Sequence, residues 1–156
     1  MSGTPKKFIV DCMLGKLAKW LKILGFDALF FSRIEDDELL ARARKEGRIL
    51  LTKDTGLLQR AHNVETLFLE SDEWPEQVRQ VLAHFGLREE VRPHTRCIDC
   101  NVVLKNLPRK NAKNLVSAFV FERADSFALC PQCGRVFWRG THFEDMETKI
   151  QDLLEN

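Results

Sequence analysis

The sequence predicts an α/β fold in which helices cover both faces of a parallel β-sheet. Between residues 7 and 86, short apolar runs alternate with segments whose apolar residues recur at helical spacing. A repeated strand–helix order of this kind is typical of parallel sheets with helices on both faces. The chain has 156 residues, of which 44% are hydrophobic and 30% charged, as in ordinary globular proteins. We expect one domain, or one domain with a small appendage.

The apolar runs predict four strands, at residues 7–11, 27–31, 49–52 and 64–70. The helices expected after them lie at residues 14–24, 36–47, directly after Asp54, and 74–86. Gly25 and Gly47 follow the first two helical patterns and indicate their ends. Acidic residues begin the second helix, where their negative charges interact favourably with the positive end of the helix dipole. Pro75 suits the first turn of the fourth helix.

Acidic residues follow the predicted strands, at the edge of the sheet where binding sites collect in such folds. They are Asp11, Asp36, Asp37, Asp54, Glu70 and Asp72. Any one of them could simply cap a helix, which is worth about 1 kcal/mol. Together they would repel one another unless a divalent cation neutralised them. Oxygen ligands without a nearby histidine favour magnesium or manganese, which promote phosphodiester hydrolysis.

Four of the five cysteines form two CxxC pairs that predict a zinc site. The expected ligands are Cys97, Cys100, Cys130 and Cys133. Four thiolates complete a tetrahedral shell, so we expect one structural zinc ion per chain; reduced, unpaired cysteines are the alternative. The fifth, Cys12, follows the first strand and is expected to be a small buried side chain.

The net charge of +1 conceals an uneven distribution, because residues 94–142 carry 8 basic and 3 acidic side chains. The expected RNA-binding residues of this segment are Lys105, Arg109, Lys110, Arg135, Trp138 and Arg139. Cations hold a phosphate backbone and aromatic rings stack on bases. Solvated loop charges and core aromatics are the alternative explanation. In the first helix, we expect Trp20 and Ile23 to be buried rather than to stack on RNA.

Three runs, "VDCMLGKLAKWLKILGFDA", "DDELLARARKEGRILLTKD" and "CPQCGRVFWRGTH", resemble the PIN-like ribonuclease family known as the Mut-seven C-terminal RNase domain. The resemblance extends from about Phe8 to His142. It implies a PIN-like parallel α/β fold with helices on both faces and a small zinc ribbon on its carboxyl side.

The resemblance also implies catalytic residues, which are Asp11, Asp36, Asp37 and Asp54. Asp11 matches the aspartate that ends the first strand of PIN-like nucleases, and Asp54 matches the aspartate of their "TxD" motif. Asp36 matches the acid seven residues before the small helix residue, here Ala43, and Asp37 is adjacent to it. Asp11, Asp36 and Asp54 are the implied ligands of magnesium or manganese. The fourth acid of the family has no clear match.

We therefore expect a metal-dependent ribonuclease in three parts, a nuclease domain at residues 1–93, a zinc ribbon at 94–142 and an acidic helix at 143–156. Two alternatives stay open, a non-catalytic RNA-binding module and a toxin-like nuclease regulated by a partner. The acidic helix could contact a protein partner or a second copy of the chain.

We expect RNA as the partner, no membrane association and a cytoplasmic location. No apolar run approaches the roughly 20 residues of a membrane span. The amino-terminal residues lack the apolar core of a signal peptide. Paired CxxC motifs suit a reducing compartment better than disulfides do.

Overall fold

A computed structural model describes residues 4–139 and 143–155 and confirms the predicted α/β fold. Four parallel strands form one sheet in the order β2–β1–β3–β4. They are β1 (Lys7–Val10), β2 (Asp27–Phe30), β3 (Ile49–Thr52) and β4 (Thr66–Phe68). Strand β4 is shorter than the predicted run, although ladder hydrogen bonds continue to the Glu65 carbonyl and the Leu69 N–H.

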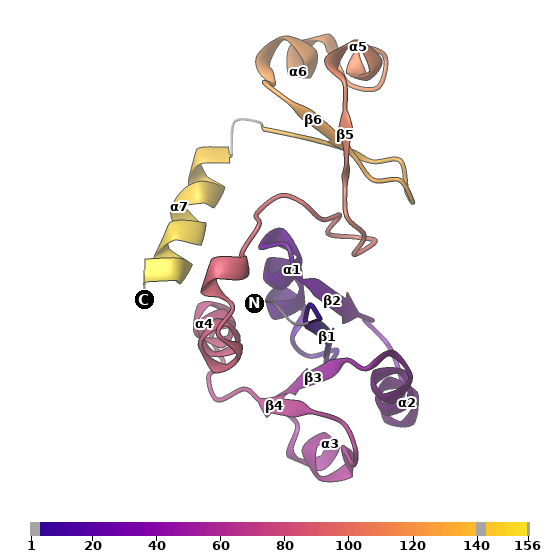
Figure 1. Cartoon of the computed structure of the whole chain (residues 1–156), viewed down its shortest axis with the longest axis vertical. Helices are drawn as coiled ribbons and strands as arrows, with labels where there is room; N and C mark the ends of the chain where they lie inside the picture. The colour runs from indigo at the N-terminus through magenta and orange to yellow at the C-terminus, as the bar shows by residue number, and fades with distance from the viewer. Residues whose placement is uncertain (1–3, 140–142, 156) are drawn as a thin grey trace.

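The helices of this unit are α1 (Gly15–Ile23), α2 (Asp36–Glu46), α3 (Thr55–Arg60) and α4 (Trp74–Phe85). Gly47 and Gly86 end α2 and α4 in the left-handed conformation, as C-terminal glycines commonly do. Figure 1 shows the sheet with α1 and α4 on one side and α2 and α3 on the other.

Alternate side chains of the central strands feed two separate cores, one on each face of the sheet. Phe8 and Val10 of β1 point into the core formed with α1 and α4, whereas Ile9 points into the core formed with α2 and α3. The rings of Trp20 and Trp74 stack 4.6 Å apart between α1 and α4. The expectation that Trp20 and Ile23 are buried is confirmed.

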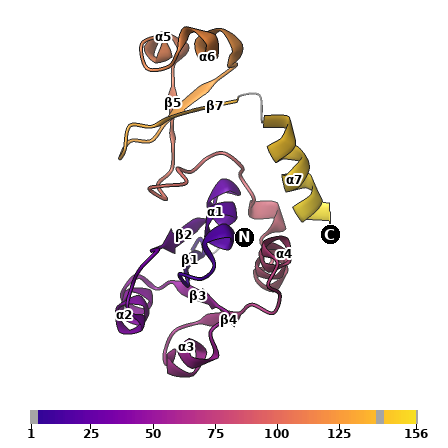
Figure 2. The ribbon, with the colours of Figure 1, turned by 180° about the vertical axis from the view of Figure 1, so that it is seen from behind.

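Helix α7 (Phe143–Glu155) returns to the first unit and packs beside α4. Its Ile150 and Leu153 are buried in the core that α1 and α4 share. Figure 2 shows α7 alongside α4 from behind. The guanidinium group of Arg88 donates a 2.8 Å hydrogen bond to the carbonyl of Leu154, near the end of this helix. The apolar face of α7 is thus covered within the chain, while its acidic residues remain on the outside.

The second unit is a small antiparallel ribbon between the 3-10 turn at Arg88–Glu90 and α7. Its strands, in the order β5–β6–β7, are β5 (Lys105–Leu107), β6 (Phe127–Leu129) and β7 (Val136–Trp138). Helices α5 (Arg109–Ala112) and α6 (Ala118–Arg123) connect β5 to β6. Leu107, Ala112, Ala124 and Phe127 form its core. No helix in the described part of the chain is long and apolar enough to cross a membrane.

Candidate acidic site and zinc centre

Asp11 lies where β1 ends, beside the end of β3. The order β2–β1–β3–β4 makes the β1–β3 boundary the switch point of the sheet, where open α/β folds bind ligands. The Asp11 N–H bonds to the Leu51 carbonyl at 3.0 Å, and its side chain is 6% exposed. Thr52, fully buried, donates its hydroxyl to Asp11 Oδ2 at 2.8 Å. The same hydroxyl accepts the N–H of Asp54 at 2.9 Å. Thr52 therefore ties the two aspartates together.

Asp54 is the N-cap of α3, as expected if its role is to cap that helix. Its Oδ1 accepts hydrogen bonds from the N–H groups of Gly56 at 2.8 Å and Leu57 at 3.2 Å. Both bonds use the same oxygen, and Oδ2 accepts none from the described residues. Capping and metal ligation are therefore compatible, because the exposed second oxygen is free for a cation.

Three of the other acids of this edge have cationic partners. Arg60, at the end of α3, reaches Asp36 Oδ2 at 3.1 Å and also contacts Asp37. Lys53 pairs with Asp72 at 3.0 Å. Among the described residues, the cysteine quartet is the only group of three or more metal-ligating side chains whose atoms converge. The structure brings Asp11 and Asp54 together through Thr52 and holds Asp36 and Asp37 against Arg60.

Cys12 is exposed, so the expectation that it is buried was wrong. It belongs to the turn that leaves β1, where the chain runs over the carboxyl edge before α1 begins. Its local burial and then the negative charges of Asp11 and Asp36 raise its pKa above the ordinary 9.0. The thiol therefore stays protonated at neutral pH, which disfavours a nucleophilic role.

The four predicted zinc ligands come together at the base of the ribbon. Their sulfur atoms all lie within 4.8 Å of one another, and Cys97 Sγ is 3.9 Å from Cys133 Sγ. A tetrahedral zinc ion with bonds of about 2.3 Å would separate its sulfur ligands by about 3.8 Å. The quartet therefore fits a closed tetrahedral site with no position for a catalytic water.

The backbone prepares both pairs for a metal. The N–H groups of Cys100 and Cys133 point at the sulfur atoms of Cys97 and Cys130, each at 3.4 Å. Burial opposes ionisation of Cys130, but the N–H groups of Cys133 and Gln132 lower its pKa to about 7. Burial and bonds with the other thiols raise the pKa of Cys100 to about 12. A metal ion must therefore displace protons to gain all four thiolates.

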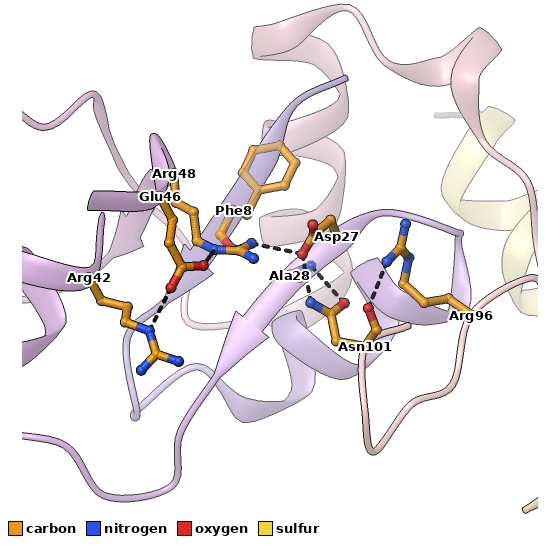
Figure 3. Close-up of polar contacts among 8 residues, drawn as sticks. All are labelled: Phe8, Asp27, Ala28, Arg42, Glu46, Arg48, Arg96 and Asn101. Atoms are coloured by element: carbon orange, nitrogen blue, oxygen red, sulfur yellow. Dashed lines mark hydrogen bonds and ion pairs between the residues drawn. The ribbon is translucent and has the colours of Figure 1, made fainter. Parts of the chain in front are cut away.

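Asn101, which directly follows the first cysteine pair, forms hydrogen bonds with the unit of the parallel sheet (Figure 3). Asn101 Oδ1 accepts the N–H of Ala28 at 3.0 Å, and its Nδ2 donates to Asp27 Oδ1 at 2.6 Å. Arg48 donates to the same Asp27 oxygen at 2.7 Å and to the Phe8 carbonyl at 3.0 Å. These residues belong to the amino-terminal ends of the strands, so the cysteine quartet lies at the opposite end of the sheet from Asp11.

Lys22 of α1 adds a charge contact to the same junction. The residue is 8% exposed, and its burial lowers its pKa, while the nearby Asp99 and Cys97 act in the opposite direction. A lysine beside Cys97 offsets part of the negative charge that four thiolates and one Zn²⁺ would carry. The two cysteine pairs thus have different neighbours. The first pair contacts the unit of the parallel sheet, and the second lies in the β6–β7 hairpin.

The expected RNA-binding residues fall into two groups. Lys105, Lys110, Arg135, Trp138 and Arg139 have exposed side chains or exposed parts. Arg109 is also exposed, but its guanidinium group donates to the carbonyls of Ala124, at 2.8 Å, and Phe121 and lies over the Phe121 ring. Residues 140–142, which include His142 of the quoted motif, lie outside the described part of the chain.

Sequence reasoning missed Arg60, Asn101 and Asp27. Asn101 carried a signal: it follows the first cysteine pair where Gly134 follows the second, and both adopt positive φ, 62° and 78°. An asparagine in place of glycine at this turn keeps the left-handed backbone and adds an amide. Arg60 carried no comparable signal, since its partners lie on another helix.

A comparison with family models matches the Mut7-C RNAse domain over residues 6–150, nearly the whole chain. Comparisons with curated proteins and with solved structures returned no match. The matched range includes both the acidic edge of the parallel sheet and the cysteine quartet. The chain belongs to the Mut7-C RNAse domain family.

Proposed function

We propose that this protein is a magnesium- or manganese-dependent ribonuclease that hydrolyses RNA phosphodiester bonds at the carboxyl edge of its parallel sheet. The observation that supports it best is the Asp11–Thr52–Asp54 arrangement at the switch point of the sheet. We further propose that the cysteine quartet holds one structural zinc ion and that the ribbon helps to bind RNA. A reducing compartment, the cytoplasm, suits these thiols.

Asp11 and Asp54 are the residues that would hold the catalytic ion, with Asp36 as the third ligand. Thr52 positions Asp11 by occupying Oδ2, which leaves Oδ1 with only a long, 3.5 Å bond from the Met13 N–H. Asp54 is fixed by its cap bonds and offers Oδ2. When bound, magnesium or manganese polarises a phosphodiester and lowers the pKa of a water molecule. The rigid strand ends supply the precise placement that such a site needs.

Asp36 would have to exchange its partner to join them. Its carboxylate is held by Arg60 at 3.1 Å, and it is about half exposed. An exposed ion pair of this kind is worth only about 0–1 kcal/mol, so a divalent ion can displace the arginine at small cost. Asp37 shares the arginine but is 89% exposed, further from the protein interior. We therefore assign the ligand role to Asp36.

Asp54→Asn is the decisive test. Asn caps a helix about as well as Asp, so the free energy of unfolding should change by less than about 0.5 kcal/mol. The loss of a ligand charge should reduce cleavage of labelled single-stranded RNA at least about 100-fold, beyond the effect expected of groups around a metal site. Glu38→Gln is the matched control: it removes an exposed acid from the first turn of α2, next to Asp36 and Asp37, that is not among the candidate ligands.

Asp11→Asn should behave like Asp54→Asn, and the double variant should lose little more than either single one, because residues that serve one ion act as a unit. Cleavage by Asp54→Asn at the parent rate, with the same metal requirement, would leave capping as its whole role. RNA binding without cleavage by the parent protein would favour a non-catalytic binding module. Association of the chain through the acidic face of α7, detected by sedimentation, would favour a partner-regulated nuclease.

A further inference from the structure

A cleft of about 560 Å³ separates the ribbon from the nuclease unit. One wall is the end of α1, represented by Lys19 and Ile23, and the other is β7, with Arg135, Phe137 and Trp138 at or near it. His94 and α7 form the floor and continue into a neighbouring cavity of about 760 Å³. Lys105, Arg109 and Lys110, which the sequence also predicts to bind RNA, do not line this cleft.

An exposed aromatic side chain lies in this cleft. Trp138 lines both cavities and is 44% exposed, whereas Trp20 and Trp74 are stacked on each other in the core. Beside it, the rings of His94 and Phe143 lie 5.3 Å apart. A large ring that faces solvent between two walls provides a platform on which a nucleobase can stack.

Cations surround this platform on both walls. Arg139 lies over the Phe143 ring at 4.7 Å and Arg135 over the Phe137 ring at 4.9 Å, with exposed side chains. Lys19 faces them from α1 and is exposed. No acid among the described residues lines the cleft itself; at its margin Asp99 is paired with Arg135 and Glu147 with His94, and Asp125 and Glu144 line the neighbouring cavity. The cleft is therefore positively charged, and a guanidinium stacked on a ring still directs its N–H groups to a phosphate.

Helix α1 connects the cleft to the acidic edge. It begins four residues after Asp11 and ends at Ile23, whose carbonyl accepts the His94 N–H at 3.0 Å. Lys16 and Lys19 are both exposed and lie one turn apart on the same side of the helix. Lys16 lines a further cavity, of about 400 Å³, with Met13 and Lys53 at the acidic edge. The helix is about 13 Å long at 1.5 Å per residue, which spans about four stacked nucleotides of 3.4 Å each.

We infer that the cleft binds single-stranded RNA, with one base stacked on Trp138 and the adjoining phosphates held by Lys19, Arg135 and Arg139. The strand then follows α1 past Lys16 to Asp11. The direction of the strand rests on the proposed ribonuclease function, whereas binding in the cleft does not. A duplex has its bases paired and stacked, so it cannot place a base on Trp138 without unpairing.

Binding is measured with an eight-uridine RNA and no added magnesium or manganese, through the quenching of tryptophan fluorescence, which should be lost in Trp138→Phe. Trp138→Ala, followed by polarisation of labelled RNA, should weaken binding about 5- to 150-fold, the range of one base–aromatic stack. Trp138→Phe keeps a ring and should bind nearly as the parent does. Leu115→Ala removes an apolar side chain of the ribbon that is 57% exposed and lines neither cavity, and it should leave affinity unchanged.

The opposite wall is tested by Lys19→Gln, which leaves the ribbon intact. Loss of one phosphate contact on a single strand should flatten the slope of log affinity against log salt by about 0.7. Lys45→Gln, which removes an exposed lysine from α2 on the far face of the sheet, should leave the slope unchanged. Affinity should also rise with RNA length until about five nucleotides, enough to fill the cleft and the length of α1.

If Trp138→Ala and Lys19→Gln both bound RNA with the parent affinity, the inference that RNA binds in the cleft would be refuted. Equal affinity for an eight-base-pair duplex would also refute it. These outcomes are separable from failure of the proposed chemistry. If Trp138→Ala binds weakly while Asp54→Asn cleaves normally, the cleft stands and the catalytic assignment fails. If Asp54→Asn is inactive while Trp138→Ala and Lys19→Gln both bind normally, the catalytic assignment stands and RNA binding in the cleft fails.

Discussion

Asn101→Gly tests whether the contact between the first cysteine pair and strand β2 stabilises the folded protein. The asparagine belongs to the ribbon segment, but its amide makes both of its hydrogen bonds with β2, to the Ala28 N–H at 3.0 Å and the Asp27 carboxylate at 2.6 Å. Its φ of 62° suits glycine, so the substitution removes the amide and leaves the backbone unstrained. The change therefore isolates the two contacts between the units.

The expected cost follows from the chemistry of the two bonds. A neutral hydrogen bond contributes about 1 kcal/mol and one to a charged group about 1.5–3 kcal/mol. Ala28 is fully buried, so its N–H would lose its partner away from solvent. Asp27 retains Arg48, which limits the loss on that side. We expect Asn101→Gly to lower the free energy of unfolding by about 2–4 kcal/mol.

The assay is urea unfolding of the zinc-loaded protein, followed by far-ultraviolet circular dichroism. Asn63→Gly is the matched control, because Asn63 also has positive φ, 61°, but its side chain is exposed and makes no hydrogen bond with the described residues. Both substitutions relax the same backbone strain, so the difference between them measures the amide contacts. Equal unfolding free energies for the two variants would refute the reasoning and leave the cysteine pair as a loosely attached loop.

Three further predictions concern single contacts. Gly25→Ala would place its Cβ 2.4 Å from the Arg92 carbonyl oxygen at a φ of +98°, and thermal unfolding should show a loss of at least about 2 kcal/mol. Hydrogen bonding by Arg48 holds the pKa of Glu46 below its ordinary 4.5, so this stabilisation exists above that pH and is lost as pH falls through the lower folded value; Glu46→Gln should flatten the acid decline of unfolding free energy. Arg109→Lys should make the ribbon more sensitive to protease, since the guanidinium holds backbone carbonyls near the end of α6.

Local patterns were sufficient for the architecture. Each strand of the first unit is a short apolar run, and Gly25, Gly47 and Gly86 end the helices as single-residue signals. A strict strand–helix alternation admits few topologies, because parallel neighbours require a helical crossover. Positions of the acids at the carboxyl edge follow from that order alone, so Asp11 and Asp54 could be named before their contacts were known.

Contacts between different helices and strands could not be predicted from such local sequence patterns. The ion pair of Asp36 with Arg60 joins the start of α2 to the end of α3, and no periodicity reports that these ends meet. Arg109 was expected to bind RNA because of its charge, and its hydrogen bonds with the carbonyls of Ala124 and Phe121 could not be predicted from the sequence. Cys12 was expected inside because strand residues precede it, yet one residue beyond Asp11 the chain is already in an exposed turn.

The acids at the carboxyl edge of the sheet differ in their charge partners. Asp36 pairs with Arg60 and Asp72 pairs with Lys53. Asp11 and Asp54 are different, since their partners are a hydroxyl and backbone N–H groups that add no positive charge. Asp11 and Asp54 would therefore hold a divalent ion without giving up a cationic partner, whereas Asp36 would join them only by leaving its exposed ion pair with Arg60.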